Sequence, residues 1–156
     1  MIFETDKDII ELASRKFEET SLPQMGVQLK VISVTKAKNI LKISKAGATM
    51  QYLTKKDVIL VVYEEAFDRL TDEHKEKLLE GAFSNVDFDT ERDKINVEND
   101  IAKEIFRMRR KYNDYVDIME ASYVIVSQIE EEEKERKEAE KIRKAEERAA
   151  RKRNNN

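Results

Sequence analysis

The chain has no cysteine, and its 156 residues include only one histidine, one proline and three glycines. Without cysteine there is no disulfide, no thiolate nucleophile and no zinc site built from thiolates. A single histidine, His74, leaves no histidine-based catalytic triad and no ordinary transition-metal site. The glycines are not spaced as in a phosphate-binding loop. We therefore expect a protein that holds no metal or cofactor and is not an enzyme; an enzyme of unfamiliar design is the remaining rival.

Long apolar runs and a large net charge are also missing. No apolar segment reaches the roughly 18 residues that a membrane-spanning helix needs. The 30 basic and 33 acidic residues nearly cancel, which argues against a nucleic-acid binder with a uniformly basic surface and against an acidic DNA mimic. The first ten residues, MIFETDKDII, lack the pattern of a signal peptide. These features predict a soluble intracellular protein with no membrane partner.

The apolar residues of the N-terminal half predict a helix and two strands. Helical spacing begins at Thr5, the expected N-cap, and is broken at Pro23. Alternation over residues 27–34 predicts a half-buried strand. Residues 57–63, DVILVVY, are apolar without alternation and predict a central strand that is buried on both faces.

Shorter elements are expected around these strands. Residues 37–43 predict a short helix closed by Gly47, and residues 49–53, TMQYL, predict a short strand. Thr71 is the expected N-cap of a further helix, since acidic residues follow it in the first turn. The side chains of that helix expected to face the core are Leu78, Leu79 and Phe83.

Acidic residues alternate along residues 87–93, a spacing that two structures could explain. A calcium loop that begins at Asp87 would use Asp89, Glu91 and Glu98 as further ligands, but Arg92 stands where such a loop requires glycine. A β-hairpin explains the same alternation without an ion. Its turn would lie at residues 90–93, with these side chains facing inward: Val86, Phe88, Ile95 and Val97. We predict the hairpin.

The last third contains neither glycine nor proline, and its apolar spacing from Ile101 predicts one long helix. Apolar residues become sparse after Ile129, which divides the chain into a domain over residues 1–129 and a solvated helical tail over residues 130–156. Residues 130–140 hold seven acids and three bases, and residues 141–153 hold seven bases and two acids. This order suits the helix dipole. Alternatively, the basic part is an arm for phosphate or for an acidic partner.

A second basic stretch, FRMRRKY, mixes positive charge with Phe106 and Tyr112, as a surface that binds phosphate and stacks on bases would. On a helix we expect these aromatic side chains to face the core while the bases, with Lys103, point outward. The candidate residues for binding nucleic acid or another partner are Arg107, Arg109, Arg110, Lys111, Arg143, Lys144, Arg148, Arg151, Lys152 and Arg153.

Two stretches, DVILVVYEEAFDRLTDEHKEKLL and FDTERDKI, resemble parts of a metallopeptidase-like domain family found in bacteriophage genomes and distantly similar to zincins. In that family a strand is followed by a helix that leads into the zinc motif H-E-L-x-H, and an acidic hairpin comes next. The resemblance covers residues 8–101. It implies a zincin-like α+β fold, with a small mixed sheet packed on helices. The long C-terminal helix lies outside the resemblance, and its apolar spacing predicts that it protrudes beyond this core. The resemblance also implies a phage protein in the cytoplasm of a bacterial host.

The chain departs from that family where the zinc chemistry would lie. At the motif it reads GAFSN, so Gly81 and Asn85 replace the two histidines and Ala82 replaces the glutamate. The third-ligand region falls near Asn99, where histidine is again missing. Zinc hydrolysis needs three protein ligands, an open coordination position and a base. The resemblance thus implies a non-catalytic protein that binds a host or phage protein, with Phe83, Ser84 and Asn85 in its working surface. The alternative is a nucleic-acid-associated accessory protein that uses the basic C-terminal helix.

Overall fold

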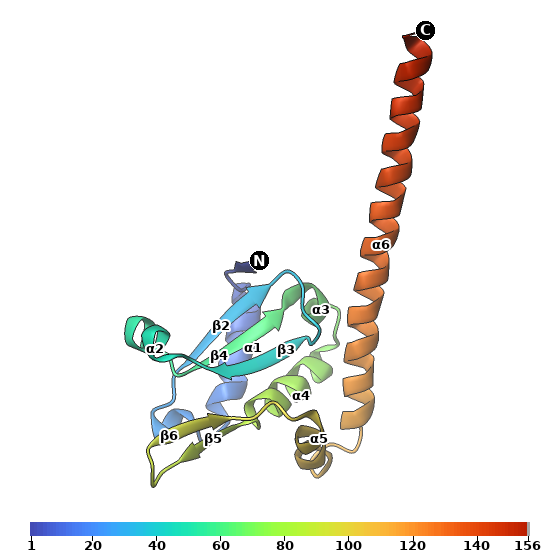
Figure 1. Cartoon of the computed structure of the whole chain (residues 1–156). Helices are drawn as coiled ribbons and strands as arrows, with labels where there is room; N and C mark the ends of the chain where they lie inside the picture. Colours follow the sequence, from blue (N-terminus) through green and yellow to red (C-terminus); the bar gives the residue numbers. More distant parts are fainter. Residues whose placement is uncertain (156) are drawn as a thin grey trace.

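A four-stranded mixed sheet with the order β1-β2-β4-β3 forms the centre of the computed structural model, which describes residues 1–155 (Figure 1). β4 runs parallel to β2 and antiparallel to β3, and β1 pairs antiparallel with the other side of β2. The predicted strands at residues 27–34 and 57–63 are confirmed, and the second is central as expected. The strands are β1 (Ile2–Phe3), β2 (Leu29–Val34), β3 (Leu41–Lys45) and β4 (Val58–Tyr63).

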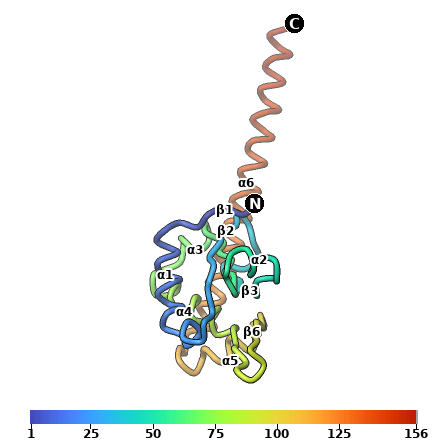
Figure 2. The backbone as a smooth tube through the Cα atoms, turned by 90° about the vertical axis from the view of Figure 1, so that its left-hand side faces the viewer, coloured from blue at the N-terminus to red at the C-terminus, as the bar shows by residue number. Residues whose placement is uncertain are grey.

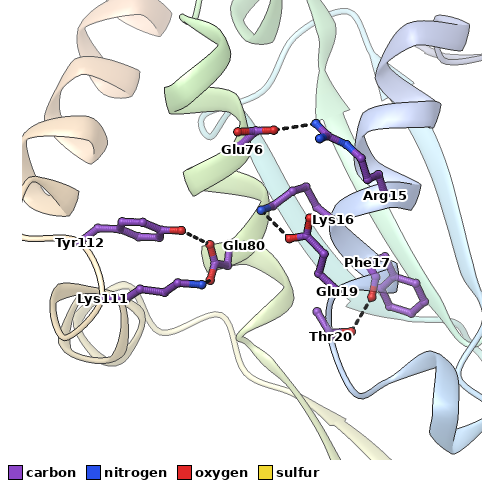
Figure 3. Close-up of polar contacts among 9 residues, drawn as sticks. All are labelled: Arg15, Lys16, Phe17, Glu19, Thr20, Glu76, Glu80, Lys111 and Tyr112. Carbon is purple, nitrogen blue, oxygen red and sulfur yellow. Dashed lines mark hydrogen bonds and ion pairs between the residues drawn. The ribbon is translucent and has the colours of Figure 1, made fainter.

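Two helices, α1 (Lys7–Glu18) and α4 (Asp72–Phe83), bury their apolar sides against the sheet. Figure 2 shows both helices on one side of it. Phe17 and Phe83 meet edge to face, with their ring centroids 5.3 Å apart. Arg15 also forms a 2.6 Å ion pair with Glu76 at the rim of this contact (Figure 3). The α+β fold class is therefore confirmed.

Capping residues explain where these helices begin. The N-cap of α1 is Asp6, whose carboxylate accepts from the Asp8 backbone N–H at 2.9 Å, so the expectation of Thr5 was wrong. The Thr5 hydroxyl instead accepts from the buried Ser33 hydroxyl at 2.9 Å. Thr71 caps α4 as predicted, because its hydroxyl accepts from the backbone N–H of His74. Two short helical segments, η1 (Pro23–Met25) and α3 (Glu64–Asp68), complete the connections.

Two short elements were predicted with the wrong type. Residues 41–45 form strand β3 rather than the end of a helix, because pairing with β4 buries Ile43 completely, opposite Leu60. Residues 49–53 belong to a helix, α2 (Ala48–Thr54), instead of a strand. Gly47 therefore precedes a helix and does not close one. No residue of α2 is buried, so this segment gains nothing from pairing with the sheet or from packing on the core. Its conformation is therefore decided by local helical hydrogen bonds.

The acidic stretch forms the predicted hairpin, with strands β5 (Val86–Asp89) and β6 (Lys94–Val97). The inward pairs match the expected ones, Val86 with Val97 and Phe88 with Ile95. In the turn, the Asp89 carboxylate accepts backbone hydrogen bonds at 3.1 and 3.3 Å from the two residues that follow Thr90. The carboxylate thus stabilises the turn, as aspartates commonly do.

The C-terminal third forms two helices, α5 (Ile101–Arg109) and α6 (Tyr115–Asn154), where the sequence predicted one. α6 packs on the core up to Ile129, the last buried residue of the described chain, and then projects beyond it (Figures 1 and 2). The predicted long, protruding C-terminal helix is confirmed. None of the helices described within residues 1–155 has both the length and the apolar character needed to cross a bilayer.

Hydrogen bonds to α4 explain the corner between α5 and α6, which contains neither glycine nor proline. The Tyr112 hydroxyl donates to one oxygen of Glu80 at 2.6 Å, and the Lys111 ammonium donates to the other at 2.5 Å (Figure 3). Burial raises the pKa of the Glu80 carboxyl, but these two hydrogen bonds outweigh it and hold the pKa below its usual value. The corner is fixed by a distant helix, which local sequence patterns do not show.

Candidate binding cleft

A cleft of about 150 Å³ lies beside strand β3, between this strand and helices α4, α5 and α6. Its apolar lining includes Leu41 and Ile43 of the strand, and Met119 of α6. Ile101 and Tyr123 line it as well and are 45% and 38% exposed, so apolar side chains remain accessible at its mouth. Exposed apolar groups around a concave surface are typical of binding sites.

Some backbone N–H and C=O groups of β3 face the cleft and form no hydrogen bond with another strand. Tyr63 donates to the Ile40 carbonyl at 2.8 Å and Ala46 donates to the Asp57 carbonyl at 2.9 Å, so the even-numbered residues of this segment bond β4. In an antiparallel pair the intervening residues direct their N–H and C=O groups the other way. In the described chain β3 is an edge strand, and the outward groups of Leu41 and Ile43 therefore face the cleft. One of them, the Ile43 carbonyl, accepts from the Asn99 side chain at 2.8 Å.

A buried carboxylate, Glu104, lies at the inner wall of the cleft and is only 9% exposed. One of its oxygens accepts from the Asn85 side-chain amide and the other from the Tyr115 hydroxyl, both at 2.7 Å. The Arg107 guanidinium donates in turn to the side-chain oxygen (Oδ1) of Asn85 at 2.5 Å. Because each carboxylate oxygen has a donor, the cost of burying its charge is partly offset.

Tyr115 is completely buried and acts as a hydrogen-bond donor in this network. Burial raises the pKa of its hydroxyl, and the neighbouring Glu104 carboxylate raises it further, so the phenol keeps its proton. The hydroxyl lies directly over Gly81. A Cβ at that position would be 1.8 Å from the Tyr115 oxygen, so any larger residue there requires the ring to move.

The four positions that the resemblance assigned to a lost zinc motif now have other roles. Gly81 lies beneath the Tyr115 ring, and Ala82 lines the cleft on the buried side of α4. Asn85 holds Glu104, and Asn99 holds the backbone of β3. Across residues 1–155 no three His, Cys, Asp or Glu side chains come together in a group that could hold a metal ion.

The basic candidates near α5 divide into tethered and exposed side chains. Arg107 is bound to Asn85, as described, and Lys111 is bound to Glu80. Arg109 and Arg110 are exposed, and the Arg110 guanidinium lies 4.8 Å from the centroid of the Phe106 ring. Phe106 is 65% exposed, so the expectation that it faces the core was wrong. The amphipathic side of α5 is set by two other residues, Ile105 and Met108, which do pack on the core.

The basic candidates of the tail lie on a separate surface. Arg143 and Lys144 form ion pairs within α6, to Glu147 at 2.9 Å and to Glu140 at 3.0 Å. The remaining four are exposed: Arg148, Arg151, Lys152 and Arg153. From Tyr115 to Arg143 the helix advances 28 residues, or about 42 Å, away from the basic residues of α5 (Figure 1). The two sets therefore cannot act as one patch.

Sequence patterns missed Glu104, Tyr115 and the free edge of β3. Glu104 falls three residues after Ile101 and four before Met108, so an acidic residue on the apolar side of α5 was the available signal. Comparisons with known proteins add no candidate, since no family model, curated protein or solved structure matches the chain significantly.

Proposed function

We propose that this protein binds an extended peptide segment of another protein, without catalysis, in the cleft beside β3. The observation that carries the proposal is the outward-facing backbone of Leu41 and Ile43, directly above an accessible apolar cleft. A peptide strand can add to such an edge through main-chain hydrogen bonds, while pockets beside the edge select its alternate side chains. Ile101 and Tyr123 at the mouth offer apolar contacts of this kind.

The chemistry of the cleft supports binding rather than hydrolysis. Both oxygens of Glu104 are engaged by donors, and the Tyr115 phenol stays protonated. A zinc hydrolase would need three ligands and a base around an open position, where this chain has a glycine, an alanine and two asparagines. The resemblance supplies the rest of the proposal: a phage-encoded, metallopeptidase-like protein acting on a host or phage protein in the cytoplasm of the infected bacterial cell.

The test is selection of peptides from a displayed random library, followed by affinity measurements on the selected sequences. Leu41→Pro removes the outward N–H without touching a bond to β4, so affinity should fall by about tenfold. Leu41→Ala keeps that N–H and is the matched control, with a smaller loss. Methylation of alternate backbone nitrogens in the peptide should weaken binding strongly in one register and little in the other. Failure to select any peptide, or equal affinity for the two Leu41 variants, would contradict the proposal.

A second candidate function, nucleic-acid binding, is favoured by the exposed Phe106 ring and the adjacent Arg109 and Arg110. An aromatic ring beside cations can stack on a base while the cations contact phosphate. If this surface binds single strands, Phe106→Ala should cost about 1–3 kcal/mol of binding free energy, with a strong dependence on salt. Titration of labelled single-stranded DNA and RNA measures this, and Tyr52→Ala on the exposed helix α2 is the control.

A further inference from the structure

The outer part of α6 carries its charges in two blocks, which we call the acidic segment (residues 130–140) and the basic segment (residues 141–153). The acidic segment holds seven acids against three bases, and the basic segment holds seven bases against two acids. Figures 1 and 2 show this part of the helix extending away from the core. Its first turn still contacts the core, through ion pairs of Glu132 with Arg69 at 2.7 Å and of Glu133 with Lys36 at 3.9 Å. Beyond these two pairs, both blocks are displayed to solvent along about 35 Å of helix.

The helix dipole does not explain the acidic segment. α6 begins at Tyr115, so residue 130 lies about four turns from the N-terminus of the helix. The dipole acts on charges only within the first and last turns. It therefore accounts for Arg151, Lys152 and Arg153 in the last turn and leaves the acidic segment without an explanation.

Ion pairs within the chain do not explain the blocks either. An isolated charged helix is best stabilised when acids and bases alternate at four-residue spacing, whereas four acids follow one another at residues 130–133. Three ion pairs lie within the tail, from Glu133, Glu140 and Glu147 to bases four residues away. Glu132 and Glu133 also pair with Arg69 and Lys36 of the core, which accounts for two of the four consecutive acids. Within residues 1–155, the following tail side chains have no ion pair: Glu131, Glu135, Glu138, Arg148, Arg151 and Lys152.

We propose that the tails of two copies of this chain pair as antiparallel helices, centred on the boundary between Glu140 and Lys141. In this arrangement residue 130 of one copy faces residue 151 of the other, so each acidic segment lies along a basic segment. A parallel pair would place like charges side by side. The partner tail ends where α6 leaves the core, next to Ile129, so the two cores stay at opposite ends of the pair.

A short apolar stripe begins next to the centre of the proposed contact, where Ile142 of one copy faces Ala139 of the other. Ile142 is 60% exposed, and the exposed Ala145 and Ala149 follow it by three and seven residues, on one side of the helix. The small side chains of the two alanines let two helices approach closely. The stripe is too short for a stable coiled coil on its own, so most of the attraction comes from exposed charges. The association should therefore weaken steeply with salt.

Nucleic acid explains these observations less well than a second copy does. The basic segment alone would suit a phosphate backbone, but the acidic segment that continues the same helix would repel it. An antiparallel copy accounts for both blocks and for their similar length. The inference is independent of the peptide-binding cleft, which lies at the other end of α6.

Sedimentation of the full chain at about 50 mM and about 500 mM salt tests the pairing. We expect a dimer whose dissociation constant rises by about tenfold or more at the higher salt. A monomer at both salt concentrations, up to about 1 mM protein, would overturn the proposal. So would an association that nuclease treatment abolishes, because nucleic acid would then be the bridge.

Charge reversal separates pairing from a general charge effect. The triple variant Glu131→Lys, Glu135→Lys, Glu138→Lys and the triple variant Arg148→Glu, Arg151→Glu, Lys152→Glu should each be monomeric, and an equimolar mixture should dimerise again. Circular dichroism confirms that each tail remains helical. The matched control changes three exposed acids outside the tail by the same charge, at Glu4, Glu11 and Glu18, and should dimerise like the wild type.

The absence of cysteine allows the orientation to be measured directly. Glu131→Cys and Arg151→Cys, mixed under mild oxidation, should form the mixed disulfide in preference to either homodimer. Preferential Glu131→Cys homodimers would indicate parallel helices and refute the antiparallel arrangement.

Discussion

Helix α6 consists of two halves that are helical for different reasons. Its inner half, from Tyr115 to Ile129, contributes five buried residues and has its conformation fixed by packing. Its outer half, from residue 130 onward, has no buried residue within the described chain and depends on helix propensity and charge pairs. One continuous helix thus joins a part that the core requires to a part that contacts the core only at Glu132 and Glu133, through their ion pairs with Arg69 and Lys36.

The largest difference between the halves should appear on removing one large side chain from each. Tyr115→Ala should lower the free energy of unfolding by about 3–5 kcal/mol, because it leaves a cavity and takes a donor from Glu104. Ile142→Ala, measured under conditions where the chain is monomeric, should change it by less than about 0.5 kcal/mol. Urea denaturation of both variants measures the contrast, and similar losses would show that the outer half belongs to the core.

Overpacking should have a smaller but still clear effect at the inner half. Gly81→Ala should destabilise by about 1–3 kcal/mol, since its Cβ would collide with the Tyr115 hydroxyl. In a Tyr115→Phe background the cost should shrink without vanishing, because the ring carbon that bears the hydroxyl would still lie 2.7 Å from the new Cβ. A double-mutant cycle measures this coupling, and additive costs would contradict the contact.

Acid should distinguish the ion pairs of the two regions. The pKa of Glu80 at the α5–α6 corner is lowered in the folded protein, so its contribution is present above the unfolded pKa and is lost as the pH falls through the folded value. Glu80→Gln should therefore cost about 1 kcal/mol near pH 7 and progressively less below about pH 4.5. Denaturation at several pH values measures the difference. The hydrogen bond from Lys144 also lowers the pKa of Glu140 in the outer half, but this pair is fully exposed and screened by solvent. Glu140→Gln is therefore the control and should change the profile in the same direction by much less.

The smallest expected effect on the core comes from removing the outer half altogether. Truncation after Ile129 should leave the midpoint and cooperativity of unfolding nearly unchanged, since almost no apolar surface is lost. Circular dichroism should nevertheless show a clear loss of helix. A large shift in the midpoint would mean that the tail folds back on the core in solution.

Sequence patterns predicted those elements whose structure is decided locally. The apolar run at residues 57–63, the cap at Thr71 and the alternation around Asp87 were sufficient for a strand, a helix and a hairpin. The patterns failed where distant residues decide. Residues 41–45 became a strand because β4 offered a partner, and the chain turns near Lys111 because α4 holds it there.

For the candidate site as well, the sequence indicated single residues but not the contacts between distant ones. The family resemblance directed attention to Asn85 and Asn99, both of which line the cleft. It could not show that Asn85 binds Glu104 or that Tyr115 covers Gly81, because these contacts join residues 19 and 34 positions apart in sequence. The free edge of β3 was hidden by the helix predicted at residues 37–43.

Under the proposed peptide binding, the side chain of Asn99 limits how far a short ligand can pair along β3. Its amide already satisfies the Ile43 carbonyl, so a short peptide gains hydrogen bonds only near Leu41 and leaves Asn99 in place. To pair with Ile43, a longer strand must first displace the Asn99 amide from the Ile43 carbonyl and donate its own N–H there. One hydrogen bond then replaces another, so the net gain in binding free energy is small. A longer ligand therefore gains affinity only from contacts that it makes beyond Ile43. The cleft would in this way measure the length of its ligand as well as its sequence.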